Sequence, residues 1–457
     1  MKSRFLLSTA IALSCATGAF GQATQQQLPE PANGKPDLGG KPCFGYLDGY
    51  RQCITKEQAT TTGNHPYRFW IKSDPGSYHG AGWDKHARDL IFVAVPGGES
   101  SEPGTSSRSD EGLIVLDAKN NFAFVRRIPL QGTPVAKAPE EVSGIMASPA
   151  TNMIYVTTRG HLIALDLTKE KIAWSNTYEP LGSCCERGQV APDGLTLEVG
   201  SNLMNFHRVI DAKTGAIKGR IETPLSNFNH NMGMSADGKT VFDSANGVNM
   251  TIADMDTMKA KGVITFDDHV RVFVVNHDAS RVYANVNNLP GFEIADVASR
   301  KVIKRVEAPG EMWKKKWADP NLVFFGHNSA QHGLALTPDE REIWVPDAIN
   351  NQILVWDNKG NDNWQIDTAK TIPLKYSCDW ITMGLDGKIA MLSSGDIVDV
   401  KNHKIIAQMR DERGNLLHSE KFLEITFDAD GHMLRTVNQF SEGIPAAVAA
   451  AQKEARN

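Results

Sequence analysis

Apolar and polar residues alternate along most of the chain in short runs, and Gly, Asp, Asn and Pro separate the runs. Alternation with a period of two predicts strands with one buried and one more polar face. Long stretches with a helical period are nearly absent. The pattern therefore predicts an all-β protein made of many short antiparallel strands.

A repeat runs through these strands. A strand that ends in an apolar residue and an aspartate, followed by a short turn and another strand, occurs seven times, mostly at intervals of 42 to 49 residues. The aspartates are Asp117, Asp166, Asp211, Asp254, Asp296, Asp357 and Asp399. Each is expected to cap its turn, because a short carboxylate accepts hydrogen bonds from nearby backbone N–H groups. Four strands per repeat predict a seven-bladed β-propeller of four-stranded antiparallel blades, with eight blades as the alternative.

Two segments carry a further resemblance. "LTPDEREIWVPDAINNQILVWD" and "MSADGKTVFDSANGVNMTIADMDT" resemble the YVTN-family β-propeller repeat, and "ASPATNMIYVTTRGHLIALDLTKEKI" is a looser copy. The resemblance spans about residues 140 to 410. It implies a propeller fold but no particular function, because propellers of this kind include binding proteins, surface proteins and some enzymes.

The predicted organisation has four parts. Residues 1–21 form a signal peptide, 22–64 a linker, 65–440 the propeller, and 441–457 a tail or short helix. The predicted blade cores span roughly 78–130, 140–180, 183–224, 227–266, 268–310, 328–374 and 378–411. The strand-like segments 67–74 and 421–437 are expected to pair and close the ring, or to form part of an extra blade.

The first residues predict export. Lys2 and Arg4 form a basic start, "FLLSTAIALSCA" is an apolar run too short to cross a bilayer, and small residues precede Gln22. A periplasmic or secreted location follows. A lipid anchor at Cys15 is less favoured, because Leu13 occupies a position that usually holds a small residue.

Net charge and hydropathy limit the classes of partner that the protein is expected to bind. The formal charge is -5, and removal of the leader brings it to about -7. The longest basic run is "KKK" at 314–316, so nucleic acid is not expected as a partner. No other apolar run approaches the ~20 residues of a membrane helix. We expect a monomer whose partner is a small molecule, a protein or a component of the cell envelope.

Five cysteines remain after cleavage of the leader, and export makes them disulfide candidates. Cys43 and Cys53 would close a small loop within the linker. The adjacent Cys184 and Cys185 would form a strained bridge, or one of them would reach Cys378. One thiol is left over in any scheme.

Alignment of the repeats on their turns brings one polar position of each blade into register. The aligned residues are His79, Ser143, Glu186, His230, Arg271, His332 and Asp379. In a propeller the first strand of each blade is innermost, so these side chains are expected to form a ring at one end of the axial channel. Long loops at 96–112 and 310–329 are expected on the same face. The sequence thus predicts a ligand-binding or active site there.

Several chemistries fit this ring. Binding of a ligand or partner without catalysis is the primary interpretation. Imidazoles are common ligands of Zn, Cu, Fe and Ni, so His79, His230 and His332 are candidate ligands of a transition-metal ion. Such an ion would support a hydrolase, lyase or oxygenase. Arg271 would either pair with the ring's carboxylates or clamp a substrate carboxylate.

Other interpretations are weaker. A vicinal disulfide would be compatible with a quinoprotein-like dehydrogenase, although the tryptophan-bearing docking repeats of that family are missing. A wet channel would also tolerate polar strand starts with no function. The segment "HSEK" at 418–421 is read as a solvated turn, with a contact at the rim of the site as the alternative. His86, His161, His207, His277 and His403 are expected to be ordinary surface or core residues.

Overall fold

The computed structural model describes only part of the chain in detail. The described residues are 46–47, 52–53, 87–95, 112–128, 142–158, 161–169, 171–178, 185, 187–201, 204–223, 225, 229–245, 247–287, 289–309, 332–411 and 414–437. The predicted signal peptide, the segment 67–74, the two long loops and the C-terminal tail lie outside these residues. Within the predicted linker, β1 (Tyr46–Leu47) pairs antiparallel with β2 (Gln52–Cys53).

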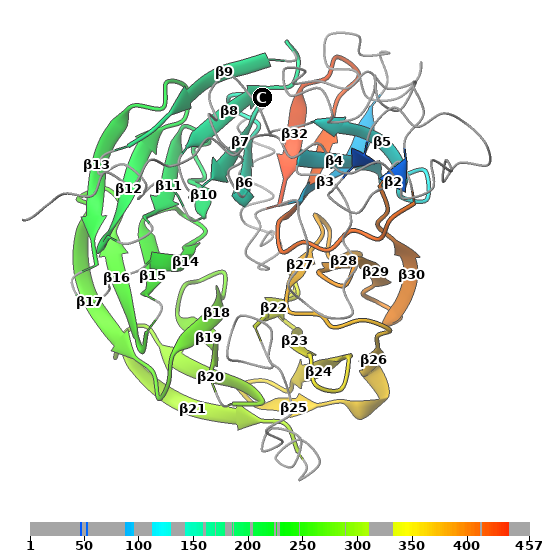
Figure 1. Ribbon diagram of the computed structural model, residues 1–457. Coiled ribbons are helices and arrows are strands. Elements are labelled where there is room, and N and C mark those ends of the chain that lie inside the picture. The colour runs from blue at the N-terminus through cyan, green and yellow to red at the C-terminus, as the bar shows by residue number, and fades with distance from the viewer. Residues whose placement is uncertain are drawn as a thin grey trace, which may run out of the picture.

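The described chain is almost entirely β-structure, arranged in antiparallel sheets around a central axis (Figure 1). Two four-stranded sheets occupy residues 142 to 222. They contain β6 (Val142–Ser148), β7 (Met153–Thr158), β8 (Leu162–Asp166) and β9 (Lys171–Asn176), then β10 (Gly188–Val190), β11 (Thr196–Gly200), β12 (Phe206–Asp211) and β13 (Ile217–Glu222). Each sheet keeps its strands in chain order.

The next eight strands form two four-stranded antiparallel units. The units contain β14 (Asn229–Met234), β15 (Thr240–Ala245), β16 (Asn249–Asp254) and β17 (Lys259–Thr265), then β18 (Val270–Val275), β19 (Arg281–Val286), β20 (Gly291–Asp296) and β21 (Lys301–Glu307). One parallel pair, Thr265 with Lys301, joins their outermost strands into an eight-stranded sheet.

Two further sheets follow the same order. They contain β22 (Ala335–Leu336), β23 (Glu342–Asp347), β24 (Gln352–Asn358), β25 (Trp364–Ile366) and β26 (Ile372–Pro373), then β27 (Ile381–Met383), β28 (Ile389–Leu392), β29 (Asp396–Asp399) and β30 (Lys404–Gln408). The only helix in the described ranges is the 3-10 turn η2 (Thr368–Lys370). No helix of the described chain is long and apolar enough to cross a membrane.

Strands from early and late parts of the chain meet in one sheet. It contains β3 (Arg88–Val95), β4 (Gly112–Asp117) and β5 (Ala123–Ile128), together with β31 (Phe422–Phe427) and β32 (Met433–Thr436). The order is β32-β31-β3-β4-β5, and β31 runs antiparallel to β3. The predicted strand segment 421–437 therefore closes the ring, and its partner is β3.

The first strands of neighbouring sheets contact one another, including β6 with β10, β10 with β14, β14 with β18, β18 with β22, and β22 with β27. First strands therefore surround the axis, and later strands lie further out (Figure 1). All-β sheets arranged in this way have the architecture of a β-propeller.

The predicted turn caps form at six of the seven repeat aspartates. Each accepts a hydrogen bond from a backbone N–H two or three residues later; these are Asp117, Asp166, Asp211, Asp254, Asp296 and Asp399. The prediction is wrong for Asp357, whose carboxylate accepts from the Lys370 and Lys359 ammonium groups. There the chain enters β25 by a longer turn, and Lys370 on η2 takes the place of the backbone donor.

Candidate functional site

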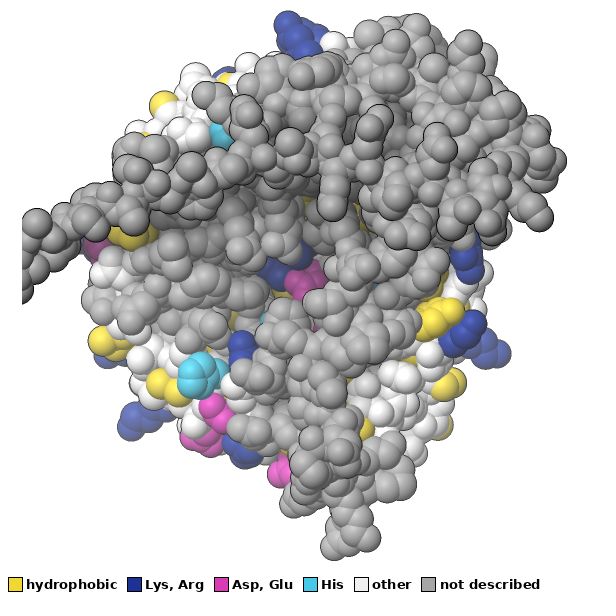
Figure 2. All heavy atoms as spheres, viewed as in Figure 1, with side chains coloured by type: hydrophobic (Ala, Val, Ile, Leu, Met, Phe, Trp, Pro, Cys, Tyr) yellow, Lys and Arg dark blue, Asp and Glu magenta, His cyan; other side chains and the backbone are white. Residues whose placement is uncertain are grey.

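Four buried side chains gather where innermost strands begin. Arg187 directly precedes β10, Trp380 directly precedes β27, Glu420 lies two residues before β31, and His332 lies three before β22. They come from four different sheets and are linked to one another through the contacts described below. We call these four residues the axial cluster, and the end of the ring where they lie the channel face. Figure 2 shows basic and acidic side chains side by side near the middle of the ring.

Arg187 and Glu420 form the centre of the axial cluster. Nη2 of Arg187 pairs with Oε2 of Glu420. Arg187 is only 2% exposed and Glu420 only 9% exposed, so the pair is held away from bulk water. Nε and Nη1 of Arg187 have no hydrogen-bond partner among the described residues. Within the part of the chain that the structure describes, this buried guanidinium therefore has two nitrogens available to donate to a ligand.

Trp380 and His332 complete the cluster. The Arg187 guanidinium carbon lies 4.1 Å from the centre of the Trp380 ring, a cation–π contact. Trp380 is held by the hydrogen bond from its Nε1 to Thr382 Oγ1, at 3.2 Å. The His332 and Trp380 rings lie 6.2 Å apart, and His332 Nδ1 is 3.8 Å from Glu420 Oε1. Glu420 therefore lies between the histidine and the arginine.

The closing strand positions Glu420. Ser419 Oγ donates to the Ala94 carbonyl at 2.5 Å, and the Ala94 N–H donates to the Lys421 carbonyl at 2.9 Å. Lys421 Nζ also lies 3.4 Å from Glu420 Oε2. These bonds fix the residues on both sides of Glu420 to the end of β3. The contacts that attach this segment to β3 and close the ring therefore also position Glu420 in the axial cluster.

Asp379 occupies a separate polar pocket beside Trp380. Ser393 Oγ accepts from the backbone N–H groups of Asp379 and Trp380, at 2.9 and 3.0 Å, and donates to the Asp379 carboxylate. Cys378 is a buried free thiol, and its Sγ donates to the Trp380 carbonyl. Burial raises the pKa of Cys378 to about 12. The predicted alternative that joins this thiol to Cys184 or Cys185 is therefore wrong.

The predicted ring residues have different surroundings. His332 and Asp379 are buried as described, and Ser143 is buried at the start of β6. Arg271, in β18, donates from Nε to Asn287 Oδ1 at 2.6 Å, and burial lowers its pKa. His230 lies on β14, with only its backbone described, whereas His79 and Glu186 lie outside the described residues. The ring as a metal site stays a prediction, as do disulfides at Cys43, Cys53, Cys184 and Cys185.

Sequence reasoning missed three of the four axial residues. Arg187 is adjacent to the aligned Glu186, and Trp380 is adjacent to the aligned Asp379, so the alignment found the right strand ends but not these side chains. The interpretation of "HSEK" as a solvated turn is wrong, because Glu420 is buried against Arg187. The sequence signal that could have identified Glu420 is the charged pair Glu420 and Lys421. This pair directly precedes an apolar strand in the segment that was expected to close the ring.

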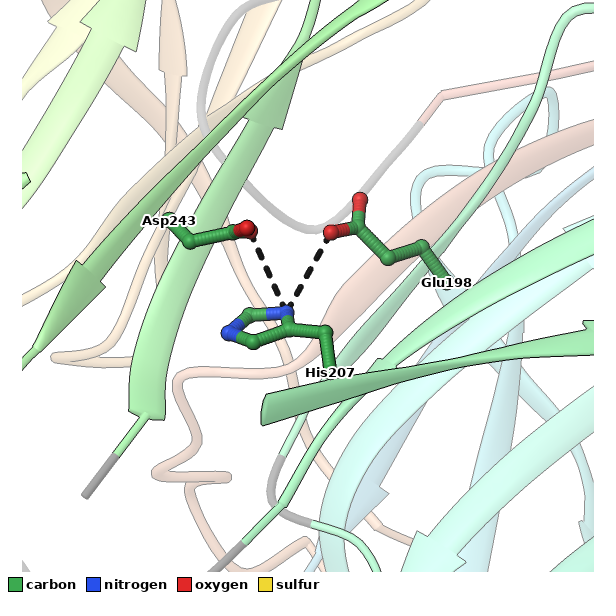
Figure 3. A group of neighbouring side chains, drawn as sticks. All are labelled: Glu198, His207 and Asp243. Atoms are coloured by element: carbon green, nitrogen blue, oxygen red, sulfur yellow. Dashed lines mark ion pairs between the residues drawn. The ribbon is translucent and has the colours of Figure 1, made fainter. Parts of the chain in front are cut away.

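A second buried polar group lies on the second and third strands of two neighbouring four-stranded units. Glu198 on β11, His207 on β12 and Asp243 on β15 bring their ligating atoms within 4.8 Å of one another (Figure 3). Burial and the neighbouring Glu198 carboxylate raise the pKa of Asp243 well above its usual value. Among the described residues, these three form the one group of His, Cys, Asp and Glu side chains with the spacing of metal ligands. His207 was expected to be an ordinary residue.

No family model matches the chain, and no curated protein matches it in sequence. Among solved structures, hydrazine synthase of Kuenenia stuttgartiensis is similar, with a TM-score of 0.47 and 15% identity. The match covers 68% of this chain and 98% of that chain.

Proposed function

We propose that the protein binds a small ligand with an anionic or carbonyl oxygen at the channel face, and that Arg187 is the anchor. The observation that carries the proposal is that Nε and Nη1 of a guanidinium only 2% exposed have no hydrogen-bond partner among the described residues. A buried donor without a partner costs about 1–3 kcal/mol, more when it is charged. A site that keeps such donors gains that free energy when an acceptor binds.

The surroundings of Arg187 favour a ligand with at most one negative charge. Glu420 occupies Nη2 and Trp380 covers one face of the guanidinium, so the N–H groups of Nε and Nη1 remain. The Nε N–H points to the side of Nη2, whereas Nη1 lies beside Cδ, so each nitrogen can donate a charge-assisted hydrogen bond to an acceptor oxygen of its own. Glu420 balances the arginine charge and discourages strongly charged anions. We therefore favour a monocarboxylate or a neutral carbonyl group as the ligand.

The wider setting of this function rests on the sequence. The leader supports an exported protein, located in the periplasm or secreted. The seven repeat aspartates support a propeller of seven blades, and the quoted repeats support a YVTN-like type. A ligand-binding propeller outside the cytoplasm is the function that these features favour together.

A metal-dependent enzyme is the second candidate. It is favoured by His332, which is 2% exposed and has its Nδ1 3.8 Å from the Glu420 carboxylate. A carboxylate next to a histidine often orients that histidine toward a metal. In this candidate His79 and His230 would complete the ligands. Loss of bound metal in a His332→Ala variant would favour it.

The test is a binding series with mono- and dicarboxylates, followed by calorimetry and thermal shift. Wild type is compared with Arg187→Lys and Arg187→Gln, and Arg341→Gln is the matched control, because Arg341 is an exposed arginine. We expect a carboxylate to stabilise wild type and the control, to bind Arg187→Lys at least tenfold more weakly, and not to bind Arg187→Gln. Equal binding to wild type and to a folded Arg187→Gln would refute the proposal.

A further inference from the structure

The group Glu198, His207 and Asp243 lies between two neighbouring sheets. Glu198 pairs with Val209 across β11 and β12, and His207 lies two residues before Val209. Residues two apart on a strand share a face, so Glu198 and His207 lie on the same face of the β10–β13 sheet. In Figure 3 Asp243 approaches them from the other side.

The register of the two sheets explains how Asp243 reaches this position. Thr196 pairs with Asp211 in one sheet, and Thr240 pairs with Asp254 in the next, so the two threonines are equivalent. Glu198 is two residues after Thr196, whereas Asp243 is three residues after Thr240. The side-chain period of two therefore places them on opposite faces of equivalent strands. In sheets stacked around a ring, those are the two faces that meet.

Each of the three side chains is buried, and each has at least one nitrogen or oxygen atom without a hydrogen-bond partner among the described residues. Glu198 and His207 are 0% exposed and Asp243 is 1% exposed. Over the described ranges, hydrogen-bond partners are missing for both ring nitrogens of His207, both carboxylate oxygens of Asp243 and Oε1 of Glu198. Glu198 is held by its other oxygen, which accepts from Gln189 Nε2 at 2.5 Å. Oε1 is thus left directed toward His207.

The distances fit coordination better than hydrogen bonding. His207 Nδ1 lies 3.3 Å from Glu198 Oε1 and 3.2 Å from Asp243 Oδ1, and it points between them (Figure 3). Neither contact has the geometry of a hydrogen bond. Ligand atoms about 2.0–2.2 Å from a tetrahedral metal lie roughly 3.3–3.6 Å apart. Both measured separations are close to this range.

The charges of these three side chains also favour a bound cation. Two carboxylates and a neutral imidazole together carry two negative charges, and isolated buried charges are very costly. No Lys or Arg forms an ion pair with either carboxylate among the described residues. A divalent cation would neutralise the group and would supply a partner for Glu198 Oε1, His207 Nδ1 and one Asp243 oxygen, three of the five atoms that have none among the described residues.

We propose that Glu198, His207 and Asp243 bind a divalent transition-metal ion that joins the β10–β13 sheet to the β14–β17 unit. One imidazole nitrogen and two carboxylate oxygens suit Zn²⁺ or Mn²⁺. Because all three ligands are buried, the ion has a structural role, and no substrate reaches it through the described surface. Beside the three ligands, this contact between sheets is formed by an apolar cluster that includes Val209, Ile221 and Val241. The ion adds metal coordination to the apolar contact between the β10–β13 sheet and the β14–β17 unit.

The test measures bound metal and the Co²⁺ spectrum. Tag-free protein is refolded with Zn²⁺, Mn²⁺ or Co²⁺, dialysed and analysed by mass spectrometry of metal content. We expect about one equivalent in wild type and visible d–d absorption with Co²⁺. Asp243→Asn and His207→Ala should lose both signals, whereas His269→Ala, which changes an exposed histidine, should keep them. Chelation should lower the melting temperature of wild type but not of Asp243→Asn.

Two outcomes would overturn the inference. The first is the absence of metal from refolded wild type with every ion, which would leave protons as the neutralising charges. The second is metal that persists in folded Asp243→Asn and disappears in His332→Ala, which would place the ion in the predicted histidine ring. If the variants do not fold, the wild-type metal content and Co²⁺ spectrum decide the matter. Neither outcome affects carboxylate binding at Arg187, which is measured separately.

Discussion

Arg187 and Glu420 are 233 residues apart in the chain, yet their side chains form one buried ion pair. Arg187 precedes an inner strand of the ring, and Glu420 belongs to the segment that closes it. The pair therefore joins the inner end of the β10–β13 sheet to the segment that closes the ring.

Removal of one partner of this pair should be more damaging than removal of both. Glu420→Gln leaves a buried arginine without its counter-ion, and we expect a loss of about 3 kcal/mol in the free energy of unfolding. Arg187→Met should cost a similar amount. The double variant Arg187→Met with Glu420→Met should lie closer to wild type than either single change. Urea unfolding checks this, and a double variant as unstable as the sum of the single changes would contradict it.

Stability should depend on the protonation of Glu424, in β31. Burial, followed by the negative charge of Asp89, raises the pKa of Glu424 to about 8, from an ordinary value of 4.5. Asp386 raises it further, whereas the Leu385 N–H, which donates to Glu424 at 2.5 Å, lowers it. The folded protein therefore holds a proton that the unfolded chain releases.

The sign of the pH effect follows from this difference. Because the folded pKa is the higher one, the free energy of unfolding should fall as pH rises between about 4.5 and about 8, by on the order of 5 kcal/mol. Glu424→Gln should remove most of that slope, and Glu222→Gln, an exposed carboxyl, should not. Melting temperatures of the three proteins from pH 5 to pH 8.5 provide the measurement. Parallel curves for wild type and Glu424→Gln would exclude the effect.

Gly333 should tolerate no side chain. A Cβ at this position would lie 2.6 Å from the Asp379 carbonyl oxygen and 2.9 Å from Pro346 Cγ, so an alanine would push apart the β22 and β27 strands. We expect Gly333→Ala to cost about 1–3 kcal/mol and to weaken ligand binding at the channel face. Gly414→Ala is the control, because its Cβ would meet no atom within 4 Å, although its φ of +82° adds some strain. Similar losses in both variants would show that close packing at Gly333 is unimportant.

Cys378 should resist alkylation in the folded state. Its thiol is buried and its pKa is raised to about 12, so very little thiolate forms at neutral pH. Iodoacetamide at pH 8 should leave Cys378 unmodified in native protein and should modify it in urea. Peptide mapping by mass spectrometry identifies the modified cysteine. Rapid labelling of Cys378 in the native protein would show that the pocket opens readily.

Much of the fold was predictable because it depends on local periodic signals. The two-residue alternation fixes strands, and the repeat aspartates fix turns such as the one capped by Asp211. The same alignment located the strand ends near the axis, next to Arg187 and Trp380. It could not choose between adjacent residues, because backbone register at a strand start depends on tertiary contacts rather than on the repeat.

The buried group at His207 lay beyond this reasoning for a different reason. Glu198 and Asp243 occupy positions one residue out of step in their repeats, and an alignment of equivalent positions separates such residues. They meet only because opposite faces of adjacent sheets pack together. A search for charged residues at core positions of facing strands, rather than at equivalent positions, would have found them.

The place of β31 in the sheet of β3 determines when the chain can complete its core during synthesis. Leu90 and Phe92 of β3 are fully buried in the finished protein, and they pack in one cluster with Leu423 and Ile425. The ribosome releases those residues only after it has made more than 300 residues beyond β3. Until then the apolar edge of β3 has no strand to cover it. The nascent protein therefore passes through a long open-ring stage that is vulnerable to aggregation, and a truncation before Phe422 would make that stage permanent.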